Sequence, residues 1–259
     1  IKGDKMAIIE TFKGFIPGKS HEMDVPSPPY DVLSTEEAKH IIDNNQKSFL
    51  KVIKPETHFN GSEVRENELH EFASKIFQEM IQKGYLQQSI NDSFYIYEIS
   101  KQDHVQTGLA AGFSVQEYEE GAIKKHELTR EKKERDRAIH IDTVSANTGP
   151  IFITYKAVEE LDKYIETLKT QSSIIAIDSV HETHHKLWEI SDLEQIKTLK
   201  HYFANIEALY IADGHHRTQA ALRVRNSRRE KNINHSGTEA YNTFLGVAFP
   251  GNQLKIMDY

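Results

Sequence analysis

The sequence predicts an α+β fold, a mixed α/β arrangement in which helices and strands alternate but some strands also pair as hairpins. Apolar residues recur at helical spacing in some segments and alternate with polar residues in others. Neighbouring strand-like segments joined by short polar turns are not expected in a doubly wound parallel sheet. Because 259 residues suffice for one large domain, we expect a single domain over residues 1–259.

The N-terminal part of the chain contains two expected helices. A strand is expected over residues 7–16 and a rigid loop over 25–33, where three prolines forbid a helix. Ser34 and Glu37 match a capping box and predict a short helix after them. Apolar residues at helical spacing predict a longer helix over 64–83.

The middle of the chain predicts a hairpin followed by a polar helix. Residues 93–100 and 106–115 alternate like strands, with a turn near 101–104. A second helix cap is expected at 114–117. The polar run over 123–147 is expected to be a solvated helix, braced by opposite charges four residues apart.

The remaining segments continue the mixture of helices and strands. Their expected order is strand 150–155, helix 158–170, strand 173–178, strand 186–190, helix 192–203, strand 208–212, helix 214–229, helix 239–241 and strand 243–249. Residues 253–259 have the pattern of a strand that is cut off, so we expect the natural chain to continue beyond Tyr259.

Composition excludes several classes of function. A formal net charge of −7 argues against a nucleic-acid partner, since such binders need excess Lys and Arg. The absence of cysteine removes disulfides and thiol catalysis, and it suits a cytoplasmic location. No run of about 18 apolar residues is present, so no membrane span is expected.

One motif resembles a zinc site by its letters alone. Residues 181–185, His-Glu-Thr-His-His, match the H-E-x-x-H signature, whose chemistry needs both histidines on one helix face. The flanking residues 174–177 and 187–190 are strand-like, so we expect the motif in a hairpin turn without zinc.

The most informative segment is Asp213–Thr218, at the expected junction of strand 208–212 with the next helix. Backbone N–H groups and the dipole at such a helix start attract phosphate. The candidate groups are the N–H groups near Gly214, the two imidazoles, the guanidinium fork, a hydroxyl, and a carboxylate for Mg²⁺ or a proton; they belong to Asp213, Gly214, His215, His216, Arg217 and Thr218. The alternative interpretation is a helix cap with exposed polar residues.

Asp213–Arg217 resembles the signature of the ParB/sulfiredoxin superfamily, whose members bind a nucleotide at this helix start. Within that superfamily, the free serine kinases carry a closely similar segment and an upstream His-Glu pair, which His21 and Glu22 resemble. The resemblance implies that Glu22 is a catalytic base. It also implies a ParB/sulfiredoxin-like core over about 7–55 and 200–259, with a large insertion over about 56–199.

A wider resemblance links nearly the whole chain to a widespread family of long-uncharacterised proteins related to these kinases. It is carried by residues 28–32, 126–129, 133–137, 149–152 and 212–217. Asp31, in the first of these motifs, is a second candidate for the base. The resemblance implies that a lid or phosphate clamp is formed by Lys125, His126, Arg130, Asp136 and Arg137.

These resemblances imply a small-molecule kinase that uses ATP or ADP with Mg²⁺ and converts free L-serine to O-phosphoserine. Asp213 would hold Mg²⁺, the N–H groups of Gly214–Arg217 would cradle the β-phosphate, and His216 and Arg217 would stabilise the transferring group. The alternative is a nucleotide-binding regulatory protein without turnover, and a His-ligated metal hydrolase is a third hypothesis. A homodimer stays open.

Overall fold

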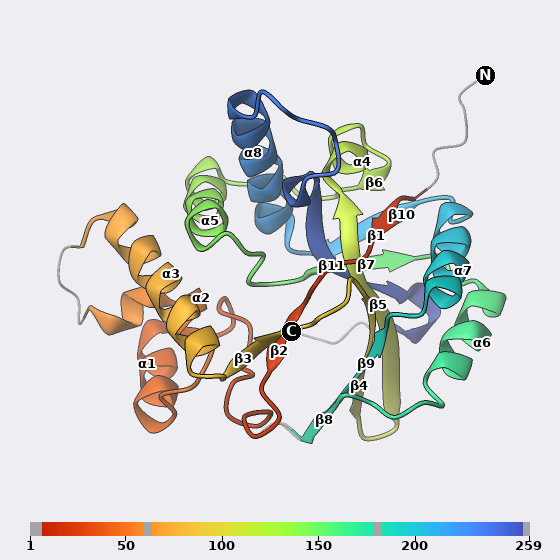
Figure 1. The fold of residues 1–259 in the computed structure, drawn as a ribbon, viewed down its shortest axis with the longest axis horizontal. Coiled ribbons are helices and arrows are strands. Elements are labelled where there is room, and N and C mark those ends of the chain that lie inside the picture. The colour runs from red at the N-terminus through yellow and green to blue at the C-terminus, as the bar shows by residue number, and fades with distance from the viewer. Residues whose placement is uncertain (1–6, 60–63, 179–182, 256–259) are drawn as a thin grey trace.

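A computed structural model describes residues 7–59, 64–178 and 183–255, and it confirms the mixed α+β fold (Figure 1). Within these residues, one large sheet has the strand order β6-β10-β7-β11-β5-β4-β9-β8, and β1 pairs with β5 outside that path. Its strands are β1 (Ile9–Glu10), β4 (Phe94–Lys101), β5 (His104–Ser114), β6 (Ile123–Lys124), β7 (Ile151–Tyr155), β8 (Ile175–Asp178), β9 (His184–Ile190), β10 (Leu209–Asp213) and β11 (Thr243–Pro250).

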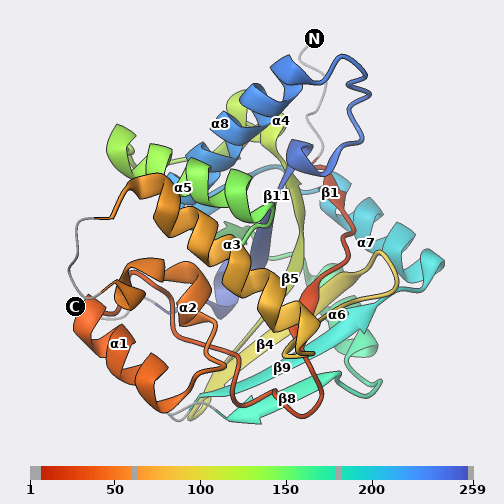
Figure 2. The ribbon, with the colours of Figure 1, turned by 60° about the vertical axis from the view of Figure 1, so that its left-hand side comes forward.

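Helices cover the sheet on two sides (Figures 1 and 2). On one side lie α6 (Glu159–Leu168) and α7 (Leu193–Ala204). On the other side are α1 (Thr35–Asn44), α2 (Leu50–Ile53), α3 (Glu66–Gln82), α5 (Glu131–Val144) and α8 (His215–Lys231), together with a small sheet of β2 (Phe15–Pro17) and β3 (Leu86–Gln88). A short α4 (Val115–Glu119) follows β5, and 3₁₀ turns occupy η1 (Pro55–His58), η2 (Ala240–Asn242) and η3 (Gly251–Gln253).

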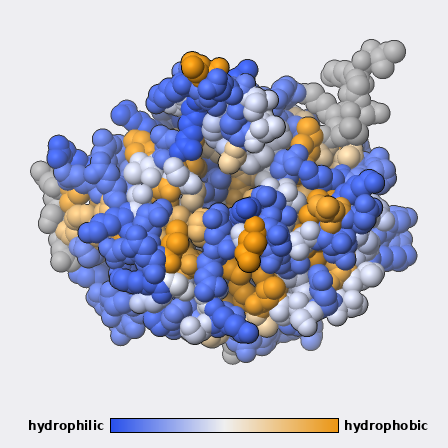
Figure 3. Space-filling model, viewed as in Figure 1, coloured by the Kyte–Doolittle hydropathy of each residue, from blue (hydrophilic) through white to orange (hydrophobic). Residues whose placement is uncertain are grey.

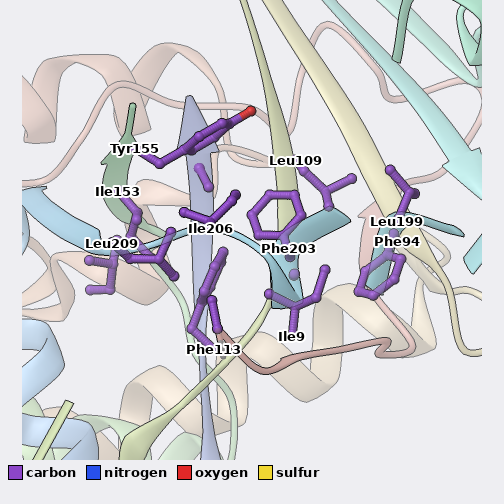
Figure 4. Packing of buried hydrophobic residues seen from close by; sticks show 14 of the residues in the cluster. Ile9, Phe94, Leu109, Phe113, Ile153, Tyr155, Leu199, Phe203, Ile206 and Leu209 are labelled. Atoms are coloured by element: carbon purple, nitrogen blue, oxygen red, sulfur yellow. The ribbon is translucent and has the colours of Figure 1, made fainter. Parts of the chain in front are cut away.

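The main core lies between the sheet and the α6–α7 layer. Figure 4 shows Phe203 of α7 among Leu109 and Phe113 of β5, with Phe94 of β4 nearby. Full burial of one such side chain contributes about 1.5–3 kcal/mol. The outer face viewed in Figure 3 is mostly hydrophilic, with apolar patches separated by polar ones.

Several local patterns in the sequence formed the expected structures. The Ser34 hydroxyl accepts the Glu37 N–H, and the Glu37 carboxylate accepts the Ser34 N–H, so the predicted capping box begins α1. The Ser114 hydroxyl likewise caps α4. The predicted hairpin is the β4–β5 pair, which turns between Lys101 and His104.

The strand expected over residues 7–16 is wrong as a continuous element. It divides into β1, which pairs with β5, and β2, which pairs with β3 in the small sheet. Between them Gly14 donates its N–H to the Tyr95 hydroxyl at 3.1 Å. A Cβ at Gly14 would lie 3.0 Å from that ring, so the chain passes from one sheet to the other at a residue without a side chain.

The helix expected over 123–147 is shorter than predicted. Residues 123–124 form β6, parallel to β10, and α5 begins only at Glu131. The intervening segment is extended because tertiary contacts hold its backbone, such as the Arg130 N–H that donates to Nε2 of His216 at 3.1 Å.

Two other expectations concern residues 253–259 and the H-E-x-x-H match at residues 181–185. The strand expected over 253–259 is replaced at its start by η3, and residues 256–259 lie outside the described part. The strand-like flanks of the H-E-x-x-H match are confirmed, since β8 and β9 pair antiparallel, whereas His181 and Glu182 themselves are not described.

None of the helices in the described ranges is long and apolar enough to cross a membrane.

The region expected to be an insertion supplies β4, β5 and β7, which lie inside the same large sheet as β10 and β11.

Candidate functional site

The turn between β10 and α8 is built around Gly214. This residue has φ +97°, in the left-handed region that favours glycine. A Cβ here would also lie 3.0 Å from Cδ1 of Ile151 in the neighbouring strand β7. The chain therefore passes from strand to helix at a single residue, and the first turn of α8 is fixed against the sheet.

The start of α8 suits an anion. Its first intrahelical hydrogen bond runs from the Thr218 N–H to the Gly214 carbonyl at 2.9 Å. Among the described residues no side chain caps the helix, and its first turn holds no acidic residue. The earlier N–H groups, of His215, His216 and Arg217, therefore point their partial positive charge toward any ligand at this end.

Arg217 folds back across the turn and fixes the exposed carboxylate of Asp213. Its Nη2 donates to Oδ2 of Asp213 at 2.7 Å, and its Nη1 donates to the Pro150 carbonyl at 2.7 Å. A Cβ at Gly149 would lie 3.1 Å from Nη1, so this glycine leaves room for the guanidinium. The pair thus presents a cation and an anion in defined positions beside the helix start.

His215 lies under the turn and contacts a segment far away in the sequence. Its side chain is buried, with Nδ1 3.4 Å from Oε2 of Glu127 and Nε2 3.5 Å from the His126 N–H that donates to it. Burial lowers the pKa of His215, and the neighbouring His126 lowers it further, against the opposing effect of Glu127 and Asp213. We therefore expect a neutral imidazole at neutral pH.

Thr218 does not present its hydroxyl to the turn. The side chain is fully buried, and its Oγ1 donates to the Gly214 carbonyl at 3.0 Å. This geometry stabilises the first turn of α8 and leaves phosphate contacts to the backbone, His216 and Arg217.

An ion pair between exposed Arg223 and buried Glu134 holds the segment before α5 against α8. Arg223 donates from Nε to Oε2 of Glu134 at 2.8 Å, and the Thr129 hydroxyl donates to Oε1 of the same carboxylate. Burial alone would raise the pKa of Glu134, but these hydrogen bonds lower it below its ordinary value. The residues around His126 and Arg130 are thereby anchored beside the α8 start.

Next to Arg217 lies a small recess that is partly open to solvent. Its lining includes Tyr30 from the proline-rich loop, Arg137 from α5 and Arg217. The guanidinium of Arg137 lies 4.8 Å from the centre of the Tyr30 ring and 2.6 Å from Oδ2 of Asp136. Arg137, an expected lid residue, therefore lines the same recess as Arg217 of the α8 turn. Asp31 follows Tyr30 directly in the sequence.

Two of the four His-Glu pairs in the sequence, at residues 21–22 and 126–127, occupy different surroundings. His21 contacts Asp24, Lys47 and the ring of Tyr85, which follows α3. Its neighbour Glu22 therefore lies near the end of α3. The structure instead brings the pair His126-Glu127 to His215. The sequence analysis did not identify Glu127 as a candidate base. The signal was available, because the His-Glu dipeptide that singled out Glu22 also occurs at residues 126–127.

Comparisons with known proteins give a family without an activity. The family described as "Protein of unknown function (DUF1015)" matches residues 9–259. No curated protein and no solved structure matches the chain at a significant level.

Proposed function

We propose that this chain, which belongs to the DUF1015 family, is a small-molecule kinase. In this proposal it transfers a phosphoryl group from ATP or ADP to the hydroxyl of free L-serine and forms O-phosphoserine. The observation that supports it most is the uncapped start of α8, where an ion pair, two imidazoles and a remote carboxylate gather at one turn.

The phosphates of the nucleotide would bind at the helix start. The N–H groups of His215, His216 and Arg217 would surround the β-phosphate, and the Arg217 guanidinium would contact the transferring group. Asp213 fits a magnesium ion, because Arg217 engages only its Oδ2 and leaves Oδ1 as a hard oxygen donor. The ion would neutralise the charge of the phosphates during transfer.

We assign the general base to Glu127 rather than to Glu22 or Asp31. Its carboxylate is 57% exposed and lies 3.4 Å from the imidazole at the helix start, so it can reach both solvent and a bound acceptor. The hydroxyl proton would pass to Glu127 while the oxygen attacks the terminal phosphorus and the nucleoside phosphate leaves with the broken P–O electron pair.

The recess beside the turn suits an acceptor that carries a carboxylate. Arg137 and Arg217 both line it, and Arg137 stacks on Tyr30. Two guanidinium groups at one small recess favour an anionic group such as the α-carboxylate of an amino acid. This supports serine as the acceptor, in agreement with the resemblance to the free serine kinases.

The test is phosphorus NMR of the protein with Mg²⁺, L-serine and either ATP or ADP, with Asp213→Ala as the control. A serine-dependent phosphomonoester that disappears in the variant supports the kinase. The other outcome is that the wild type binds nucleotide, Asp213→Ala abolishes this binding, and no hydroxy amino acid is phosphorylated. The kinase proposal is then rejected, and the alternative of a nucleotide-binding regulator is favoured.

A further inference from the structure

The strongest feature outside the α8 turn is a histidine buried without a hydrogen bond. His70 of α3 is 1% exposed, and among the described residues neither of its ring nitrogens has a partner with full hydrogen-bond geometry. Buried polar atoms without partners are rare and destabilising. An imidazole in this position therefore needs an explanation.

Two carboxylates approach the same imidazole. Oδ1 of Asp136, on the facing helix α5, lies 3.3 Å from Nε2 of His70. Glu66 lies one helical turn before His70 on α3, and residues at this spacing share a helix face. One donor atom from each of the three residues lies within 4.8 Å of the others.

The orientation of Asp136 is fixed from its other side. Arg137 donates from Nε to Oδ2 of Asp136 at 2.7 Å, which leaves Oδ1 directed at His70. Metal-binding carboxylates are commonly held in this way by a hydrogen bond to the second oxygen. The Arg137 contact thus positions Asp136 as a ligand instead of competing with His70.

A simple ion pair between His70 and Asp136 explains less. It gives no role to Glu66, which converges on the same imidazole as Asp136. A cation among the three donors contacts one nitrogen of the imidazole and both carboxylates at once. The short N···O separation matches neighbouring ligands of one metal ion, whose bonds are about 2.0–2.2 Å long.

We propose that Glu66, His70 and Asp136 bind one divalent first-row transition-metal ion, with Zn²⁺ as the reference ion. The imidazole nitrogen selects such ions over Mg²⁺ and Ca²⁺, which prefer ligand sets made only of oxygen. The ion connects α3 to α5, the helix that carries Arg137 to the recess. This site is separate from the magnesium position at Asp213 and does not depend on the proposed kinase activity.

The test measures metal binding by the full chain without nucleotide. The protein is stripped with a chelator and dialysed against Zn²⁺, and the bound metal is counted by mass spectrometry. We expect one ion per chain in the wild type, and at least a ten-fold loss of affinity in Glu66→Gln and His70→Gln. The matched control is Glu68→Gln, in the same helical turn, because the Glu68 carboxylate already binds Arg65 at 2.9 Å.

Glu66 is exposed, so its replacement by Gln leaves the packing of α3 intact and separates loss of metal from loss of folding. A His184→Asn variant tests the histidines of β9 as the competing zinc site. The proposal is overturned if the wild type binds no metal, if Glu66→Gln binds as tightly as the wild type, or if the bound zinc is lost in His184→Asn. If the protein shows no kinase activity but still binds the ion, the proposed metal site is supported.

Discussion

Oε2 of Glu127 lies 3.4 Å from Nδ1 of His215, which joins the extended segment before α5 to the buried side of the α8 start. The imidazole is buried and the carboxylate is mostly exposed, so the contact runs from the protein interior to the surface of the site. Any acceptor bound at the helix start would therefore meet a carboxylate whose orientation is set by a buried histidine.

The first prediction concerns this carboxylate. Glu127→Gln keeps the side-chain size but removes the proton acceptor, and general bases contribute about 10²–10⁴-fold to rate. We expect serine phosphorylation to fall by at least about 100-fold, with nucleotide affinity changed by less than about threefold, because the α8 N–H groups remain. Steady-state rates and a nucleotide titration measure the two effects separately.

Glu22→Gln and Asp31→Asn are the comparison variants. Both carboxylates were candidates from the sequence, and neither contacts His215 in the described structure. If Glu22→Gln abolishes turnover and Glu127→Gln leaves it intact, the assignment of the base to Glu127 is wrong.

A second prediction concerns the left-handed residue at the turn. In Gly214→Ala the new Cβ would occupy a left-handed backbone and lie 3.0 Å from Cδ1 of Ile151. Strain of this kind costs about 1–3 kcal/mol. We expect lower stability in urea unfolding and loss of nucleotide binding.

Gly237→Ala is the matched control, because Gly237 also has a positive φ, +92°, but its Cβ would meet no atom of the described residues within 4 Å. It should show the backbone cost alone and keep nucleotide binding. Equal effects of the two substitutions on nucleotide binding would contradict a specific role for the Gly214 turn.

Local patterns in the sequence predicted most of the regular elements. The capping pair Ser34 and Glu37 marked the start of α1, and periodicity located α3 and the β4–β5 hairpin. These signals depend on neighbours a few residues apart, which the sequence displays directly. The uncharacterised family was also anticipated, and the match over residues 9–259 confirms it.

Contacts between distant segments could not be predicted in this way. The break in the first strand depends on the ring of Tyr95 above Gly14, and the extended start of the polar run depends on the imidazole of His216. The contact between His70 and Asp136 joins α3 to α5, and no pattern in the sequence links these two helices. Glu127 was overlooked for the same reason, since its partner His215 lies on another element.

A third prediction concerns the ion pair that joins α5 to α8. Arg223→Ala leaves the buried Glu134 carboxylate without its main cationic partner, and a broken pair of this kind costs about 1–3 kcal/mol. We expect a lower midpoint in thermal unfolding. Arg229→Ala, an exposed position on the same helix, should change it little. An equal shift in both variants would show that helix propensity, not the pair, is responsible.

The last prediction is a pH dependence at the turn between α8 and β11. The N–H groups of Ser236 and Gly237 donate to the Glu239 carboxylate at 2.6 and 3.0 Å. These hydrogen bonds, led by that from Ser236, lower the pKa of Glu239 from 4.5 to about 2. Because the folded pKa lies below the unfolded one, the stabilisation is complete above pH 4.5 and disappears as the pH falls toward 2.

Glu239→Gln should therefore be less stable than the wild type at pH 7, and the difference should shrink as the pH falls below 4.5. Urea unfolding of both proteins at several pH values measures this difference, and carbon NMR of the Glu239 carboxyl reports its pKa directly. A stability difference that stays constant from pH 7 to pH 3 would mean that the variant acts through packing and that the turn does not depend on the charge of Glu239.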